Sequence, residues 1–338
     1  MRRLRESLST NKRINDHLCI FVIGCGSIGQ RHIANFKKLG VREIIAFDPQ
    51  SEQRRIVAEK FGIKTLSTIA AGWKENPNIA LIAAPTNLHI PLALEAARRS
   101  CHLFIEKPLS HALGGITKLI NTVGKRSLTT MVGCNMRFHP GPAAVKRVLD
   151  EQAIGKIIAA RIQTASYLPC WQPSQDYRKS YSASVEYGGA ILDCIHEIDL
   201  ALWYLGSAKV LTAVSLSAKS IGLKTDGLAE VILRHKSGAL CNVHLNFIQR
   251  DYRRTCQIIG SEGTIYWDFS DHSVKVFDAE GKLARTIAEP KGWEINQMYV
   301  DELSHFLSAV SGNSQTMNPL SGGLDALKIA LAARKLGK

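Results

Sequence analysis

The chain has 338 residues, of which 45% are hydrophobic and 21% charged. This composition supports a sizeable buried core and excludes disordered, collagen-like and low-complexity proteins. The formal net charge is +14. No basic stripe interleaved with aromatic residues accompanies this excess, so we expect an anionic cofactor and an anionic small-molecule substrate rather than nucleic acid.

The cysteine pattern and the length of the apolar runs indicate whether the chain enters a membrane and in which redox environment it is found. No run approaches the roughly 18 apolar residues of a membrane span, so no membrane partner is expected. The eight cysteines show neither C-x-x-C pairs nor zinc spacing, which predicts a reduced, cytoplasmic protein without a metal. Residues 1–16 carry five lysines and arginines against two acids and are expected to be a flexible basic leader.

Short apolar runs alternate with helical patterns from residue 17 to 138. Runs that are apolar on both faces and separated by helices predict a parallel sheet with helices on either side. The expected strands are residues 18–23, 43–47, 79–83, 102–105 and 128–132. The expected helices between them are residues 27–39, 51–61 and 89–99.

A glycine motif directly follows the first of these strands. The run Gly24-Cys25-Gly26-Ser27-Ile28-Gly29 allows a tight turn, close approach of a pyrophosphate and a helix N-terminus aimed at it. Asp48 ends the second strand, where a carboxylate binds the ribose hydroxyls of NAD. Arg54 and Arg55 lie nearby and leave NADP open. The candidate cofactor residues here are Gly24, Gly26, Ser27, Ile28, Gly29 and Asp48.

Two further loops leave strands at the same edge of the predicted sheet, where such sheets bind ligands. The residues expected to border the cofactor are Pro85, Thr86, Asn87, His89, Glu106 and Lys107. Lys107 can share a proton with a substrate hydroxyl, and the Lys107–Pro108 bond can be cis. Taken alone, Asn87 and His89 suit a helix cap and a helix surface, and Lys107 suits a solvated turn.

Residues 139–338 follow a different pattern. Alternation with a period of two in 210–216 and 239–248, with turn signals between such runs, predicts a mainly antiparallel sheet. Helices are expected at 189–204, 296–311 and 319–336. Because an open sheet covered on one face must hide the other, we expect a homo-oligomer.

An acid and a histidine lie three residues apart in the expected helix 189–204. Asp193 and His196 then share a face, and a carboxylate beside an imidazole suits a general base that takes a hydroxyl proton. Asp199, three residues further on, can orient His196 instead. The other interpretation is a capping aspartate and a core histidine. No second cluster supports a metal site.

Taken together, these motifs resemble those of the Gfo/Idh/MocA (glucose–fructose oxidoreductase/inositol dehydrogenase) family. The matching segments, in chain order, are Gly24–Gly29, Pro85-Thr86, Glu106-Lys107-Pro108, Met136–Pro140, Gly188–Asp199 and Glu262–Ile265. By position, Lys107, Asp193 and His196 match the family's catalytic lysine, aspartate and histidine. One departure is that many members place the aspartate four residues before the histidine, not three.

The resemblance implies a Rossmann domain at 17–138 and a substrate-binding α+β domain with an open sheet at 139–338. It further implies NAD(P)-dependent hydride transfer on a secondary alcohol of a sugar, cyclitol or sugar nucleotide, and dimers or tetramers formed through the open sheet. Some members bind the cofactor without catalysis, so the alternative is a non-catalytic dinucleotide sensor.

The stretch from Tyr167 to Tyr187, just before the expected catalytic helix, is rich in aromatic and basic side chains. Aromatic faces stack on sugar C–H surfaces and arginine binds carboxylate or phosphate. We therefore expect a sugar that bears an acid or a phosphate, for example a nucleotide sugar; a lid or an oligomer contact is the alternative. The candidate substrate residues are Arg137, Tyr167, Trp171, Arg178 and Tyr181.

Overall fold

The computed structural model describes residues 17–171 and 176–337, so the expected leader at 1–16 lies outside the described residues. The chain forms two compact units. The first runs to Asn135 and also contains Ile295–Leu324; the second contains Met136–Glu294 and the chain from Asp325 onward. The return of residues 295–324 to the first unit differs from the expected division at residue 138.

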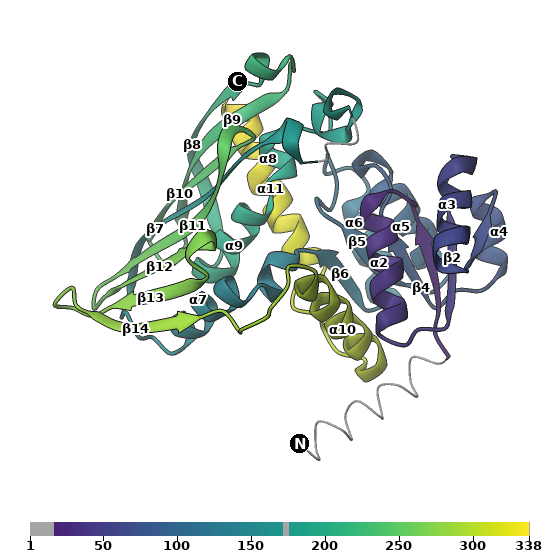
Figure 1. Ribbon diagram of the computed structural model, residues 1–338, viewed down its shortest axis with the longest axis horizontal. Coiled ribbons are helices and arrows are strands. Elements are labelled where there is room, and N and C mark those ends of the chain that lie inside the picture. Colours follow the sequence, from purple (N-terminus) through teal and green to yellow (C-terminus); the bar gives the residue numbers. More distant parts are fainter. Residues whose placement is uncertain (1–16, 172–175, 338) are drawn as a thin grey trace. The chain divides into compact units, whose positions relative to one another are not determined.

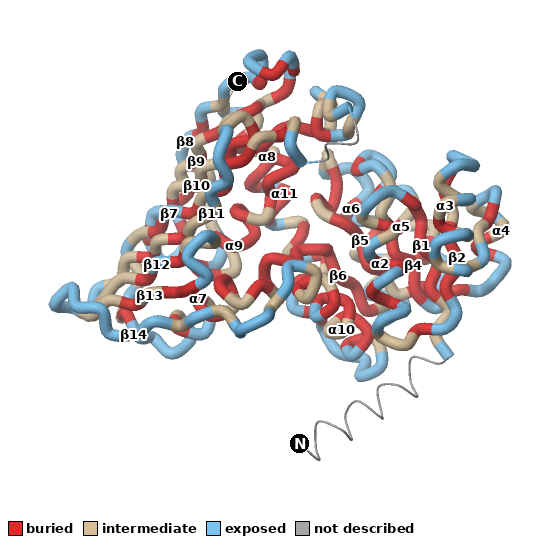
Figure 2. Tube along the Cα trace, in the orientation of Figure 1, coloured by how far each residue is buried: buried red, intermediate tan, exposed pale blue. Residues whose placement is uncertain are grey.

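A six-stranded parallel sheet forms the first unit (Figure 1). Its order is β3-β2-β1-β4-β5-β6, as in the predicted Rossmann fold. The strands β1, β4, β5 and β6 are almost wholly buried (Figure 2). Their bounds are β1 (Cys19–Ile23), β2 (Glu43–Phe47), β3 (Lys64–Leu66), β4 (Ile79–Ile82), β5 (His102–Glu106) and β6 (Thr130–Gly133).

Helices surround this sheet, and several of them present buried apolar side chains to it. Ile33 and Phe36 of α2 are fully buried, three residues apart as a helical face requires. On α4, Trp73 meets Phe21 of β1 edge to face with ring centroids 4.9 Å apart. The helices are α2 (Ser27–Lys38), α3 (Ser51–Phe61), α4 (Ile69–Lys74), α5 (His89–Arg98), α6 (Ile116–Lys125) and α10 (Asn296–Gly312).

Residues 295–324 join the first unit through the edge strand β6. The hydroxyl of Thr316 donates to the carbonyl of Thr130 (2.6 Å), and the amide of Val132 donates to the carbonyl of Asn318 (2.9 Å). Helix α10 also packs on α2. Hydrogen bonds to an exposed strand edge satisfy backbone groups that would otherwise remain unpaired, which explains why this segment returns.

The second unit is built on an eight-stranded sheet of order β14-β13-β12-β11-β7-β10-β9-β8. All its neighbouring strands are antiparallel except β7 and β10, so the predicted mainly antiparallel sheet is confirmed. The strands are β7 (Ile157–Tyr167), β8 (Ala208–Ser217), β9 (Asp226–His235), β10 (Leu240–Asn246), β11 (Ile248–Gly260), β12 (Thr264–Asp268), β13 (Ser273–Phe277) and β14 (Leu283–Ala288).

Helices lie along one face of this second sheet (Figure 1). The strands alternate accordingly: Val231 and Val243 are fully buried, whereas Val214 and Leu216 are 61% and 57% exposed. The helices of this unit are α7 (Pro140–Asp150), α8 (Ala190–Asp193) and α9 (His196–Leu205), and α11 (Leu320–Leu336) enters it from the first unit.

Short 3-10 helices connect these elements at η1 (Thr86–Leu88), η2 (Asn135–Phe138), η3 (Leu168–Cys170), η4 (Tyr177–Lys179), η5 (Tyr181–Ala183), η6 (Lys219–Ile221) and η7 (Phe269–Asp271). Within the described part of the chain, no helix has the length and apolar character needed to cross a membrane.

Candidate active site

The glycine motif forms a tight loop between β1 and α2. Gly24 has a φ of +108°, and a Cβ atom there would overlap the carbonyl oxygen of Ala83. A Cβ atom at Gly29 would overlap the carbonyl oxygen of Gly24. At Gly26, by contrast, a Cβ atom would meet nothing within 4 Å. Gly24 and Gly29 are thus required by the fold itself, whereas Gly26 leaves open space in front of the N-terminus of α2.

Asp48 fixes this loop from the end of β2. The amide of Cys25 donates to Asp48 Oδ2 (2.8 Å), and the amide of Gln50 donates to Oδ1 (2.9 Å). Burial, and secondarily the charge of Asp48, raises the pKa of the Cys25 thiol to about 12, so this cysteine stays neutral. An open glycine cradle, a helix N-terminus and a strand-end carboxylate fit a dinucleotide.

Substitutions at Gly26 and Gly29 should have different effects, because Gly26 is needed for ligand binding and Gly29 for folding. In Gly26→Ala the added methyl occupies open space, so we expect an unchanged Tm but about tenfold weaker NADH binding, because the pyrophosphate must approach closely there. Gly29→Ala should instead lower stability by about 3 kcal/mol, since its methyl overlaps backbone. Thermal melts and NADH fluorescence titrations measure the two effects; equal losses of Tm in both variants would contradict this division.

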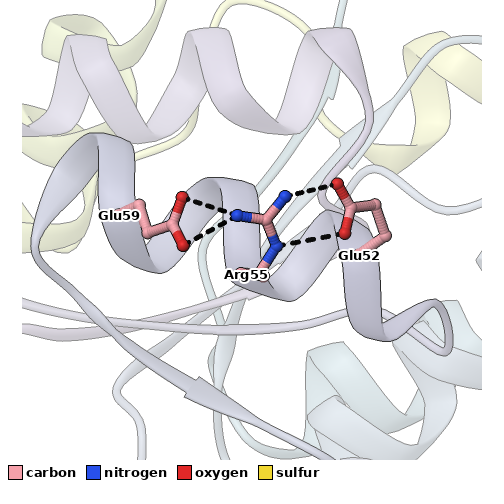
Figure 3. A network of polar contacts seen from close by, with 3 residues as sticks. All are labelled: Glu52, Arg55 and Glu59. Atoms are coloured by element: carbon pink, nitrogen blue, oxygen red, sulfur yellow. Dashed lines mark hydrogen bonds and ion pairs between the residues drawn. The ribbon is translucent and has the colours of Figure 1, made fainter.

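The two arginines that left NADP open are both engaged by the protein. Arg55 lies between Glu52 (Nη2 to Oε1, 2.7 Å) and Glu59 (Nη1 to Oε1, 2.9 Å) on α3 (Figure 3). Arg54 donates through Nη1 to the carbonyls of Asp48 (2.7 Å) and Pro49 (3.0 Å). The carboxylate at the strand end, which binds ribose hydroxyls and repels a 2′-phosphate, favours NAD here.

His89 links the two loops that leave β4 and β5. Its Nε2 lies 2.9 Å from the carbonyl oxygen of Ala84 and its Nδ1 lies 2.9 Å from that of Pro108. Burial lowers the pKa of His89, so the ring carries one N–H and donates to one of these two carbonyls. This fully buried histidine joins the loops, which differs from the expected cofactor contact. In the same segment Thr86 is buried, and Pro85 and Asn87 are exposed.

Glu106 has both carboxylate oxygens engaged inside the first unit. Its Oε1 lies 2.6 Å from Nε2 of His32 on α2, and its Oε2 accepts the backbone N–H of Lys107 (3.1 Å). Both oxygens thus have protein partners, and the expected contact of Glu106 with the cofactor stays a prediction. Lys107 itself is partly exposed and follows β5 directly, and the Lys107–Pro108 bond is cis.

The expected helix 189–204 is interrupted, which corrects the shared-face argument for Asp193 and His196. Helix α8 ends at Asp193 and α9 begins at His196. Cys194, with φ −90° and ψ 33°, separates them. The Asp193 carboxylate accepts from the hydroxyls of Ser182 (2.5 Å) and Tyr181, and His196 lies at the start of its helix.

The other carboxylates of the first turn of α9 belong to buried ion pairs. Asp199 receives two hydrogen bonds from Arg137, Nε to Oδ2 (2.8 Å) and Nη2 to Oδ1 (2.7 Å). Glu197 receives Nε–H of Arg254 (2.7 Å). Both pairs are almost fully buried. Arg137 thus holds the first turn of α9 through Asp199, and its expected role at the substrate stays a prediction.

The aromatic and basic stretch before α8 supplies exposed groups. Trp171 is 41% exposed and its indole N–H donates to Ser166 (3.0 Å). Arg250 lies over the ring of Tyr167, 4.0 Å from its centroid. Arg178 is exposed and pairs with Asp176 (2.8 Å). Residues 172–175 of this stretch lie outside the described residues.

Two partners in this site were missed by sequence reasoning. His32 occupies the same helical face as Ile33 and Phe36, and a histidine on an apolar stripe signals a buried polar partner, here Glu106. Ser182, a partner of Asp193, carries no comparable signal in the sequence. Among the described residues, no cluster of three or more histidine, cysteine or acidic side chains is arranged to hold a metal.

The parallel sheet, glycine loop and strand-end carboxylate define a Rossmann-type dinucleotide-binding protein. Residues 18–134 match the family model "Oxidoreductase family, NAD-binding Rossmann fold", and residues 143–266 match "GFO/IDH/MocA C-terminal domain". The chain therefore belongs to the Gfo/Idh/MocA family. The expected NAD-dependent oxidoreductase is confirmed, and the matches give no support to the non-catalytic sensor.

Named relatives span almost the whole chain. The chain is similar to myo-inositol 2-dehydrogenase of Thermotoga maritima, with 29% identity over 94% of this chain and 95% of that protein. It is also similar to scyllo-inositol 2-dehydrogenase (NAD(+)) of Bacillus subtilis, with 28% identity over 92% of each. A levoglucosan dehydrogenase solved with NADH and L-sorbose shares the fold, with a TM-score of 0.85, 20% identity, and coverage of 95% of this chain and 97% of that one.

Proposed function

We propose that this chain oxidises a secondary alcohol of a sugar, cyclitol or sugar nucleotide reversibly to a ketone. The observation that carries the proposal is the position of Lys107, which follows β5 at the same edge of the sheet as the glycine loop after β1. Ligands of such sheets bind at the carboxyl ends of the strands. The bound nicotinamide supplies the hydride acceptor; Lys107 and His196 handle the proton.

Each proposed catalytic group has a distinct role. His196 accepts the proton of the substrate hydroxyl as a general base. Lys107 donates a hydrogen bond to the same oxygen and holds it in place. Asp193, fixed by Ser182 and Tyr181, stabilises the imidazolium that forms.

The substrate proposed is a sugar with a carboxylate or a phosphate. Arg178 is exposed, and its pair with Asp176 lies at the surface, where ion pairs contribute little and exchange readily. Trp171 adds an exposed aromatic face for sugar C–H groups. The inositol dehydrogenases to which the chain is similar support a polyol as the core of this substrate.

NADH absorbance across a matched panel tests this proposal. Inositols, neutral hexoses, hexuronic acids, hexose phosphates and nucleotide sugars are compared at equal concentration with NAD and with NADP. We expect turnover with NAD, and a kcat/KM for anionic sugars that falls severalfold in Arg178→Gln. Equal activity on neutral and anionic sugars contradicts the charged substrate, and no turnover with any polyol contradicts the oxidoreductase reaction proposed here.

The open face of the second sheet supports a homo-oligomer in a reducing cytoplasm. Val214 and Leu216 of β8 are exposed, on the side of the strand opposite the buried Ala213, and none of the eight cysteines forms a disulfide in the described part of the chain. A second copy of this face would bury such side chains. We expect a dimer or tetramer by light scattering and smaller particles for Val214→Glu/Leu216→Glu; Lys125→Glu, on α6, serves as the charge control. A monomeric native protein would contradict the proposal.

A further inference from the structure

Glu106 is a buried charged group that the proton transfer proposed above does not use. It ends β5 and is only 9% exposed. Its partner His32 is fully buried, packed edge to face against Phe104 with ring centroids 5.2 Å apart. An apolar side chain of similar volume would fill such a place at less cost, since removing a carboxylate from water is unfavourable. A buried carboxylate at this position therefore indicates a role other than packing.

The surroundings of Glu106 leave its carboxylate little freedom. Gly133 is its neighbour across the β5–β6 pairing, and a Cβ atom there would lie 3.2 Å from Oε1. The other oxygen is tied to the backbone N–H of Lys107 at 3.1 Å. Glycine at position 133 thus makes room for a carboxylate that is held at both oxygens.

The charge of Glu106 acts on Lys107. Burial raises the pKa of the Glu106 carboxyl, but the hydrogen bond from His32, the charge of Lys107 and the backbone N–H of Lys107 together lower it. Glu106 is thus an anion at neutral pH, next in sequence to the lysine. Because the interaction between two charges is mutual, the same anion stabilises the ammonium form of Lys107.

The partner His32 connects this anion to the dinucleotide cradle. His32 lies on α2, whose first residue, Ser27, directly follows Gly26. The pair Glu106–His32 spans 74 residues of sequence, and it joins the end of β5 to α2, the helix that follows the glycine loop. On the other side of Lys107, Nδ1 of His89 lies 2.9 Å from the carbonyl oxygen of Pro108. Lys107 therefore lies between two residues whose positions are fixed by buried groups.

We propose that His32 and Glu106 are positioning residues for Lys107: the buried pair fixes the lysine backbone at the edge of the sheet and keeps a negative charge beside its amine. The inference rests on the proposed role of Lys107 in proton transfer. It adds that the lysine acts as a hydrogen-bond donor, from a backbone position fixed next to a buried anion.

Three substitutions distinguish the effect of the Glu106 charge from that of its hydrogen bond with His32. Glu106→Gln keeps the size and an acceptor for the Lys107 amide but removes the charge. His32→Leu removes the partner of the carboxylate, and His32→Gln restores an N–H donor near the position of Nε2. We expect kcat to fall about tenfold or more in Glu106→Gln and His32→Leu and to recover to within about threefold in His32→Gln. KM for NAD should change less than about twofold in all three, since the cradle is untouched.

A second readout does not depend on turnover. Acetic anhydride is used to label the protein without cofactor, and mass spectrometry compares acetylation of Lys107 with that of the exposed Lys125. Because the free amine reacts, loss of the neighbouring anion in Glu106→Gln should raise Lys107 labelling about tenfold. Labelling within twofold of the native protein would overturn the charge proposal, even if no substrate is known.

The matched control is a histidine at the opposite end of the same strand. His102 begins β5, and its Nδ1 accepts the amide of Thr129 (2.9 Å). His102→Leu should lower Tm comparably to His32→Leu but leave kcat and Lys107 labelling unchanged. If His102→Leu and His32→Leu lose kcat equally, the His32–Glu106 pair is merely structural. If the native protein turns over no polyol, the proposed function fails while the labelling result still decides this inference.

Discussion

Replacement of Lys107 by alanine should lower kcat about a hundredfold or more, the range expected for loss of a group that handles a proton in the transition state. The dissociation constant for NADH should change less than about threefold, because the amide of Lys107 still donates to Glu106 and the glycine loop is unaltered. Steady-state kinetics and NADH fluorescence titration measure the two quantities.

The control for Lys107→Ala is Lys125→Ala, which removes an exposed amine on α6 of the same unit. It should leave both quantities unchanged. Lys107→Arg is a sharper comparison, since it keeps the charge but not the compact ammonium group; we expect a loss of about tenfold or more. Native turnover in Lys107→Ala would remove this residue from the mechanism.

Replacement of His196 by alanine should also lower kcat in the direction of alcohol oxidation about a hundredfold. The loss should shrink as pH rises, because hydroxide can then accept the proton that His196 otherwise takes. In the native protein, activity should fall as pH drops and the base becomes protonated; the variant should lack this fall. The pH dependence of kcat/KM in both proteins measures the effect.

His272→Ala provides the control for His196→Ala. His272 belongs to the same unit, its side chain is 69% exposed, and its Nδ1 contacts Glu289, so its removal should leave the pH profile intact. A His196→Ala protein with the native pH profile would assign the base to another group. A loss of kcat that is the same at every pH would indicate a structural role for His196.

The glycine loop is a part of the cofactor site that could be predicted from the sequence. Gly24, Gly26 and Gly29 are needed within six consecutive residues, so their spacing alone specifies the turn. Asp48 lies further on, but the β-α-β unit that brings it back is itself short and regular. The fold of the first unit and its cofactor were accordingly predictable from local patterns.

The partners of the carboxylates near His196 could not be predicted from helical spacing. Spacing along an assumed continuous helix grouped Asp193, His196 and Asp199 on one face. The break at Cys194 ends that helix, and Asp199 pairs with Arg137, 62 residues earlier in the chain. Residues three or four apart are neighbours on a continuous helix. That rule cannot predict a contact with an arginine from a distant segment of the chain.

The sequence by itself determined the two kinds of sheet, the glycine cradle and the family, because each depends on short motifs of residues close together in the chain. Only the tertiary structure decided which buried polar side chains are paired: His32 with Glu106, Arg137 with Asp199, Arg254 with Glu197. It also decided that residues 295–324 join the first unit. An unpaired buried charge is unfavourable. Buried polar groups therefore pair with the groups that the fold places within hydrogen-bond distance, whatever their separation in sequence.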